Sequence, residues 1–239
     1  MKKFGIICVS LFVILFVPFS TVAAEDDTLG IYVGAFGGVA IPADMNTNIT
    51  DKTTGLTINQ DISLDIGWLA GVKVGYLTPF TKRILAVELE YNHIENSFDS
   101  GKTYQVQGIP LNFDSRVRVD AVMFNLIARY PEGRLHPYVG GGGGYTYLRI
   151  DNISASFAGI NVLNASSGSD SVFAHQVLAG LNFDITENWF TGLGYKFFRA
   201  GKASYGMPIT SPFFPGSHAG SIDADYTSHN IVVTIGYLY

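Results

Sequence analysis

The amino-acid sequence predicts an all-β protein, an eight-stranded, antiparallel, up-and-down β-barrel that crosses a membrane. Apolar and polar residues alternate with a period of two through eight segments, and the connections between these segments are short and long in turn. Only 15% of the residues are charged, whereas 13% are aromatic and 27 are glycine. A closed barrel is the one way in which β-strands satisfy all their backbone hydrogen bonds in lipid, so we expect closure.

The stretch Phe124–Ile150 shows the alternation best. Phe124 and Leu126 lie on one face of a strand, whereas Asn125 and Arg129 lie on the other. A turn begins at Pro131, and a second strand resumes after it. We expect the apolar face to contact lipid and the small, polar face to line a narrow barrel.

Eight segments carry this pattern, and no helical period competes with it after residue 24. We expect them to pair in chain order. The predicted strands are Ile31–Ile41, Ile66–Leu77, Ile84–His93, Val117–Tyr130, Pro137–Ile150, Val172–Asp184, Trp189–Ala200 and His229–Tyr239.

The connections alternate in length, which is typical of outer-membrane barrels with short periplasmic turns and long extracellular loops. External loops are where a small barrel usually places its function. The predicted short turns are 78–83, 131–136 and 185–188, and the predicted long, polar loops are 42–63, 97–115, 152–171 and 201–225.

The first 24 residues are predicted to be a secretory signal peptide. Two lysines precede an apolar run from Phe4 to Phe19, and small residues precede a cleavage point after Ala24. The barrel domain is then residues 25–239, and it contains no cysteine because Cys8 lies in the signal. Cleavage makes the formal net charge −7 instead of −5, and without a basic patch no nucleic-acid partner is expected.

The last predicted strand has an unbroken apolar face that ends in an aromatic residue. Ile235, Tyr237 and Tyr239 on this face resemble the carboxy-terminal signal that the barrel assembly machinery of the outer membrane reads, although the usual last residue is Phe. We therefore expect that machinery as a partner and the bacterial outer membrane as the location.

The whole mature chain resembles the small outer-membrane β-barrels, the porin-like, OmpA/OmpX-type eight-stranded family. The resemblance is carried by IYVGAFGG, VKVGYL, ILAVELEYN, HPYVGGGGGY and GLGYKF, which begin at residues 31, 72, 84, 136 and 192. It implies a monomeric envelope protein with a structural or surface-contact role, including adhesion. A soluble, lipocalin-like barrel is the alternative fold, but its solvent face would need many more charges.

The predicted inner face collects five charged residues: Lys73, Glu88, Glu90, Arg129 and Lys196. Buried charges are costly unless they are paired, so we expect a network in which Arg129 neutralises Glu88 or Glu90. An eight-stranded barrel has room only for its own side chains, which favours a structural plug over an ion pathway or a gate. Polar and glycine residues complete this face: Gly71, Gly75, Asn125, Gly142, Gln176, Gly180, Gly192 and Gly194.

Catalysis is not expected from the sequence, and neither a cofactor nor a metal is predicted. Ser228 and His229 are adjacent and so point to opposite faces of a strand, and they do not reproduce the His-x-Ser-Asn motif of lipid A deacylases. The segment 129–142 resembles barrels that act as lipid A-modifying oxidases, although it mostly encodes a strand, a turn and a strand.

The predicted loops contain apolar patches that either fold over the barrel mouth or contact a host protein, a surface ligand or a lipid. The expected function is a structural and surface-interaction role, and the alternatives are a small-solute porin and a lipid A-modifying enzyme. Lipid and lipopolysaccharide of the outer membrane are the remaining expected partners. The patches are 108–111, 157–160, 207–209 and 213–215.

Overall fold

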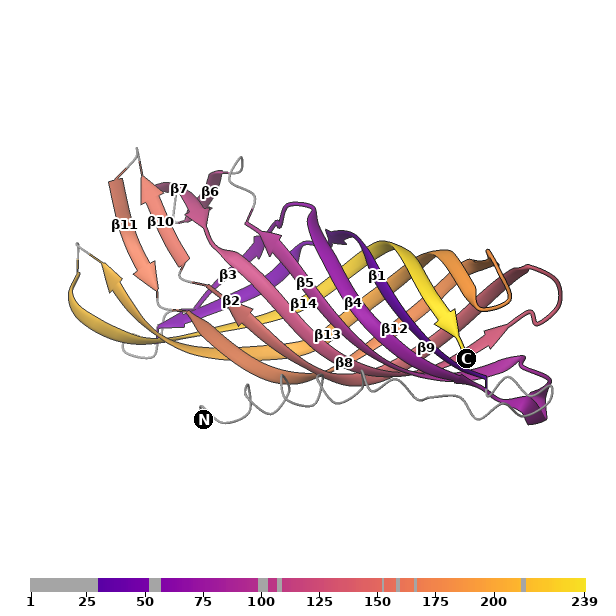
Figure 1. Cartoon of the computed structure of the whole chain (residues 1–239). Helices are drawn as coiled ribbons and strands as arrows, with labels where there is room; N and C mark the ends of the chain where they lie inside the picture. Colours follow the sequence, from indigo (N-terminus) through magenta and orange to yellow (C-terminus); the bar gives the residue numbers. More distant parts are fainter. Residues whose placement is uncertain are drawn as a thin grey trace.

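The computed structural model shows a single β-barrel whose wall continues beyond the barrel at one end (Figure 1). The predicted signal peptide, residues 1–24, lies outside the described residues, as do parts of the predicted loops. Within the described part of the chain, no helix is long and apolar enough to cross a membrane. The structure describes residues 30–51, 57–98, 103–106, 109–151, 153–157, 160–165, 167–211 and 214–239.

Eight antiparallel strands form the barrel, and each contains one of the predicted strands almost completely. Neighbours in the barrel are also neighbours in sequence, as the alternation of apolar and polar residues predicted. The strands are β1 (Ile31–Pro42), β4 (Gly67–Leu77), β5 (Leu85–Ser97), β8 (Arg116–Arg129), β9 (Leu135–Ile150), β12 (Gly168–Asp184), β13 (Trp189–Ser211) and β14 (Phe214–Leu238).

The barrel closes where the first strand meets the last. β1 pairs with β4 on one side and with β14 on the other, and in the β1–β14 ladder Ala35 lies opposite Ile235. β13 also pairs with β14, so the eight strands form an unbroken circle. The prediction of a closed eight-stranded barrel is confirmed.

The predicted long loops are wrong in part, because much of their sequence continues as strand. β13 runs past the predicted end at Ala200, and β14 begins before the predicted start at His229. Shorter strands join these two strands to form a sheet that we call the extension, which rises from the loop end of the barrel (Figure 1). They are β2 (Met45–Asp51), β3 (Thr57–Ile62), β6 (Thr103–Val106), β7 (Ile109–Asp114), β10 (Ile153–Phe157) and β11 (Ile160–Ala165).

Solvation explains why these strands look like loops in the sequence. Tyr205 of β13 and Tyr226 of β14 are each only 1% exposed and fill the interior where the extension begins. On the opposite face Ser204 and Asp223 form a hydrogen bond across the same two strands. Water, not lipid, surrounds this face, so it needs no apolar residues and the period-two pattern becomes weak.

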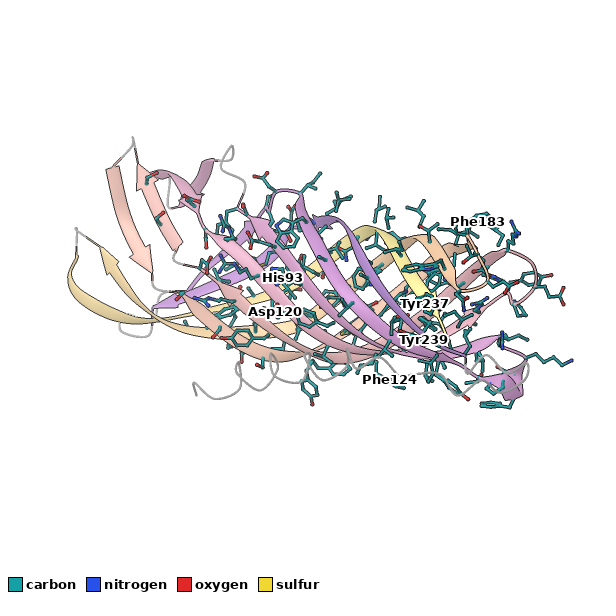
Figure 2. All side chains as sticks on the ribbon, viewed as in Figure 1. His93, Asp120, Phe124, Phe183, Tyr237 and Tyr239 are labelled. Carbon is teal, nitrogen blue, oxygen red and sulfur yellow. The ribbon has the colours of Figure 1, made fainter. Side chains whose placement is uncertain are left out.

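The barrel wall has the two unlike faces that the alternation predicted. On β8 the side chains of Val122, Phe124 and Leu126 are 45–58% exposed on the outside. Between them Met123 and Asn125 are 0% exposed and point into the barrel. Figure 2 shows side chains projecting outward along the wall, among them the labelled Phe124.

Two inward aromatic residues of β1 lie over glycines of β4. Tyr32 is directly opposite Gly75, and Phe36 is directly opposite Gly71. A methyl group added at either glycine would overlap the aromatic ring across from it. The glycines on this part of the inner face therefore make room for rings, which explains why glycine alternates with apolar residues in β4.

Candidate functional site

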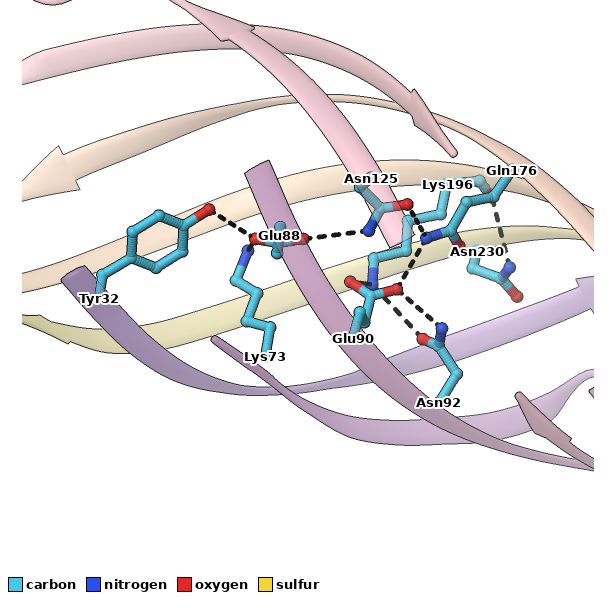
Figure 3. A network of polar contacts seen from close by, with 9 residues as sticks. All are labelled: Tyr32, Lys73, Glu88, Glu90, Asn92, Asn125, Gln176, Lys196 and Asn230. Carbon is cyan, nitrogen blue, oxygen red and sulfur yellow. Dashed lines mark hydrogen bonds and ion pairs between the residues drawn. The ribbon is translucent and has the colours of Figure 1, made fainter. Parts of the chain in front are cut away.

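The charged residues of the inner face gather around two glutamates of β5. Glu88 lies 3.2 Å from the ammonium of Lys73 on β4. The Tyr32 hydroxyl donates a hydrogen bond of 2.8 Å to Glu88, and the Asn125 amide donates another of 3.2 Å. Both oxygens of this carboxylate are thus engaged by side chains of three different strands (Figure 3).

Glu90, two residues further along the same strand, has a separate set of partners. Lys196 of β13 approaches it to 2.6 Å from across the barrel. The side-chain amides of Asn92 and Gln176 donate hydrogen bonds of 2.7 Å and 2.9 Å to its other oxygen. The Lys196 ammonium also lies 3.5 Å from the centre of the Phe36 ring, a favourable cation–π distance.

One side chain connects the two glutamate sets. Gln176 of β12 donates to the Asn125 oxygen at 2.8 Å as well as to Glu90, so Glu88 and Glu90 belong to one network. Two lysines face two glutamates, and the network carries no net formal charge. We call these residues the luminal network: Tyr32, Lys73, Glu88, Glu90, Asn92, Asn125, Gln176 and Lys196 (Figure 3).

The luminal network is almost completely shielded from solvent. The side chains of Lys73 and Lys196 are each 7% exposed, and those of Glu88 and Glu90 are 1% and 0% exposed. An isolated charge buried in the lumen would destabilise the fold by roughly several kcal/mol. Here ion pairs and further hydrogen bonds offset this cost. The arrangement crosses the lumen because its strands lie on different sides of the barrel.

The expectation that Arg129 neutralises Glu88 or Glu90 is wrong. Each acid has a lysine instead, and the Arg129 Nε atom is buried without a hydrogen-bond partner. Arg129 is the last residue of β8, next to a periplasmic turn. It lines a cavity of about 30 Å³ at the periplasmic end of the lumen. Asn182 and Asp184 of β12 line the same cavity, which is large enough for a water molecule.

A buried histidine fixes the wall of this cavity. His136 is 2% exposed, and its two ring nitrogens lie 2.7 Å from the Asp184 carboxylate and 2.9 Å from the Tyr130 carbonyl oxygen. Both nitrogens are therefore occupied by protein groups. In the described ranges no three histidine, cysteine, aspartate or glutamate side chains converge as metal ligands would.

Sequence reasoning missed two members of the luminal network, Tyr32 and Asn92. The alternation of inward and outward residues along each strand could have revealed both. Tyr32 lies between the outward Ile31 and Val33, and Asn92 continues the inward series of Glu88 and Glu90. This alternation does not predict which inward residues contact each other, because those contacts cross the barrel.

The predicted assembly residues lie on the outer face at the periplasmic end of β14. Ile235 and Tyr239 are half exposed, and the Tyr237 ring lies 5.3 Å from Trp189 and 4.8 Å from Tyr239, centre to centre. Figure 2 labels both tyrosines at this end of the barrel. The structure therefore presents these side chains together on the outer wall.

Comparison with known proteins places this architecture in a family. The model of the outer membrane protein beta-barrel domain matches residues 9–238 of the chain. The outer membrane protein PagN of Salmonella typhimurium is 24% identical over 251 residues, which cover 100% of this chain and 99% of PagN.

Two solved structures share the fold at low sequence identity. OprG of Pseudomonas aeruginosa has a TM-score of 0.51 and 13% identity, covering 91% of this chain and 99% of OprG. The outer membrane protease OmpT of Escherichia coli has a TM-score of 0.53 and 7% identity, covering 92% of this chain and 100% of OmpT. The chain belongs to the outer membrane protein β-barrel family and resides in the bacterial outer membrane.

Proposed function

We propose that this protein is a non-conducting outer-membrane barrel that acts through its extracellular extension. The luminal network carries the proposal. Four charged side chains from β4, β5 and β13 meet inside the barrel with at most 7% exposure, and amides fill the space between them. Ions would have to break these buried pairs in order to pass, so the network serves as a plug.

The extension supplies the surface for interaction. It is built on the two longest strands, β13 with 23 residues and β14 with 25, so it projects from a rigid wall and not from a free loop. Strands hold a contact surface with less conformational freedom than loops do, which lowers the entropy lost on binding. The role is surface contact with a host or environmental ligand.

The proposal includes the absence of catalysis. The fold itself does not decide this, because OmpT has the same fold and is a protease. Two observations support a non-catalytic barrel. Ser228 is buried and accepts a hydrogen bond from Asn230, whereas His229 is exposed on the outside and lies 2.6 Å from the Tyr195 hydroxyl. A serine and a histidine on opposite faces of the wall cannot share a proton.

Planar-bilayer recording tests the plug. We expect no steady single-channel current from the wild-type protein, and discrete openings when Lys196→Ala removes the charge and bulk that fill the lumen. Ser204→Ala, on the outer face of β13, is the matched control and should show no single-channel current. A steady wild-type current that Lys73→Met alters would favour a small-solute porin instead.

Two further measurements test the surface role. Cells that carry a barrel with residues 203–224 replaced by a short turn should bind host cells or matrix less than cells with the full chain. The shortened barrel must still migrate differently in unheated and boiled SDS samples, which shows that it folds. Equal binding by both strains contradicts the proposal, and a changed lipid A mass in cells with the gene would favour a lipid A-modifying enzyme.

A further inference from the structure

An arginine cluster lies on the outer wall at the level where the apolar band ends. On β8 the outward residues Phe124 and Val122 are followed, toward the extension, by Asp120, Arg118 and Arg116. Figure 2 shows Asp120 nearer to the extension than Phe124. Four residues of strand, about 13 Å, separate Val122 from Arg118, so the cluster stands just above the apolar surface.

Three strands contribute to the cluster. Glu95 of β5 lies 3.2 Å from Arg116 Nε and 3.1 Å from Arg118 Nε. Asp151, which follows β9, lies 3.2 Å from a terminal nitrogen of Arg118 and 3.4 Å from Arg149 Nε. Among these five side chains three cations share two acids, while Asp120, the next outward residue of β8, is contacted by the Tyr91 hydroxyl and the His93 ring.

Each of the outer two arginines is paired with a single carboxylate. Arg118 is in the middle and contacts both carboxylates, whereas Arg116 and Arg149 are held through Nε. Their side chains are 48% and 49% exposed. At this exposure the guanidinium groups of Arg116 and Arg149 are accessible to an external ligand. A guanidinium fixed in this way loses little further freedom when it binds an anion.

The surroundings indicate an amphiphilic anion. Below the cluster, Tyr145 and Tyr147 of β9 are 72% and 45% exposed, a position typical of aromatic residues at a membrane interface. Val122 and Phe124 continue the surface into the apolar band. Along the outer wall, cationic side chains are thus followed by aromatic rings and then by aliphatic side chains. This order matches a lipid whose charged head group is followed by acyl chains.

We propose that the arginine cluster binds the phosphates of an outer-leaflet glycolipid, lipopolysaccharide, whose acyl chains lie along β8 and β9. Arg116 and Arg149 each present a planar pair of N–H donors, the geometry that suits phosphate oxygens. Arg118 positions both through Glu95 and Asp151. The occupant is a membrane lipid because the cluster is on the outer wall and not in the lumen or at the tip of the extension.

Native mass spectrometry of the full-length barrel in a neutral detergent measures this binding directly. The probes are bisphosphorylated lipid A, the same lipid with its phosphates removed, and phosphatidylglycerol. We expect the wild-type protein to bind bisphosphorylated lipid A at least roughly tenfold more tightly than the dephosphorylated form, since two charge-assisted contacts are lost. The double variant Arg116→Gln/Arg149→Gln should lose this preference.

The control variant is Arg134→Gln, which removes an exposed arginine at the periplasmic end and should bind as the wild type does. A second variant, Arg149→Lys, retains the charge without the planar pair of donors and should bind with intermediate affinity. The heat-dependent shift in SDS gels verifies that each variant folds. The comparison of lipids needs the wild-type protein only, so it holds even if a variant fails to fold.

Three results would overturn the proposal. One is equal affinity of the wild type for lipid A with and without phosphates. Another is a folded double variant that binds as tightly as Arg134→Gln. The third is phosphatidylglycerol binding as tightly as lipid A, which would assign the cluster to anionic lipids in general and not to the glycolipid.

Discussion

Lys73 does not pair with Glu90, its direct neighbour across the β4–β5 ladder, but with Glu88 one step along the diagonal. Glu90 therefore forms its ion pair with Lys196, which comes from the opposite side of the barrel. One lysine thus neutralises an acid within the wall, and the other connects two distant parts of the wall. The pair that spans the lumen is the one that should contribute most to holding the barrel in a single arrangement.

Lys196→Met should destabilise the barrel by about 3–5 kcal/mol, because Glu90 would remain buried without a cation. The double variant Lys196→Met/Glu90→Gln should recover much of this loss, since no unpaired charge is left. Urea unfolding in lipid vesicles, followed by tryptophan fluorescence, measures the free energies. Additive losses in the double variant would show that the two side chains are not coupled.

Arg129→Leu should change the free energy of unfolding by less than about 1 kcal/mol, because neither glutamate depends on it. Lys73→Met is the matched comparison and should cost about 3 kcal/mol by leaving Glu88 without its cation. The same unfolding assay gives both values. A loss for Arg129→Leu as large as that for Lys73→Met would restore the pairing that the sequence suggested.

Gly75→Ala should destabilise the barrel by about 1–3 kcal/mol, because the new methyl group overlaps the Tyr32 ring and displaces its hydrogen bond to Glu88. Gly206→Ala in β13 is the control, since nothing lies within 4 Å of a methyl group there. If both variants unfold at the same urea concentration, the ring does not require the glycine.

Tyr226→Phe should cost about 1–2 kcal/mol, since it leaves a buried amide oxygen of Asn96 without its donor. That hydrogen bond is 2.7 Å long and joins β14 to β5 across the interior. Tyr130→Phe is the control: its hydroxyl contacts Glu132 on the surface, and its loss should leave the unfolding midpoint unchanged. An unchanged midpoint for Tyr226→Phe would mean that water replaces the lost donor.

The sequence predicted the barrel well because a membrane forces a strict contrast between the two faces of a strand. Phe124 and Asn125 differ in environment as sharply as neighbouring residues can, and the lipid requires it. The same logic assigned Glu88, Glu90 and Lys196 to the interior. The limit of this logic lies at the extension, where Ser204 and Tyr205 alternate without any aliphatic residue to mark the outer face.

Partners inside the barrel could not be predicted in the same way. Parity tells which residues point inward, but Lys196 and Glu90 come from strands that are far apart in the chain. Arg129 was placed correctly on the inner face, and it lines one cavity with Glu88, but the alternation carries no information about height along the barrel axis and so could not show that Lys73 takes the pairing position. Distances between inward side chains depend on strand tilt and register, which single strands do not encode.

The seam between β1 and β14 has a consequence for biogenesis. The two strands that close the circle are the first and the last strands of the barrel in sequence, so the contact order of this fold is high and closure must wait for the last strand to be made. Until then the polypeptide is a ribbon with two open edges and a lipophilic side, and such edges promote aggregation in water. A chain that lost β14 would keep both edges of this ribbon unpaired, so we expect it to aggregate instead of closing into a barrel.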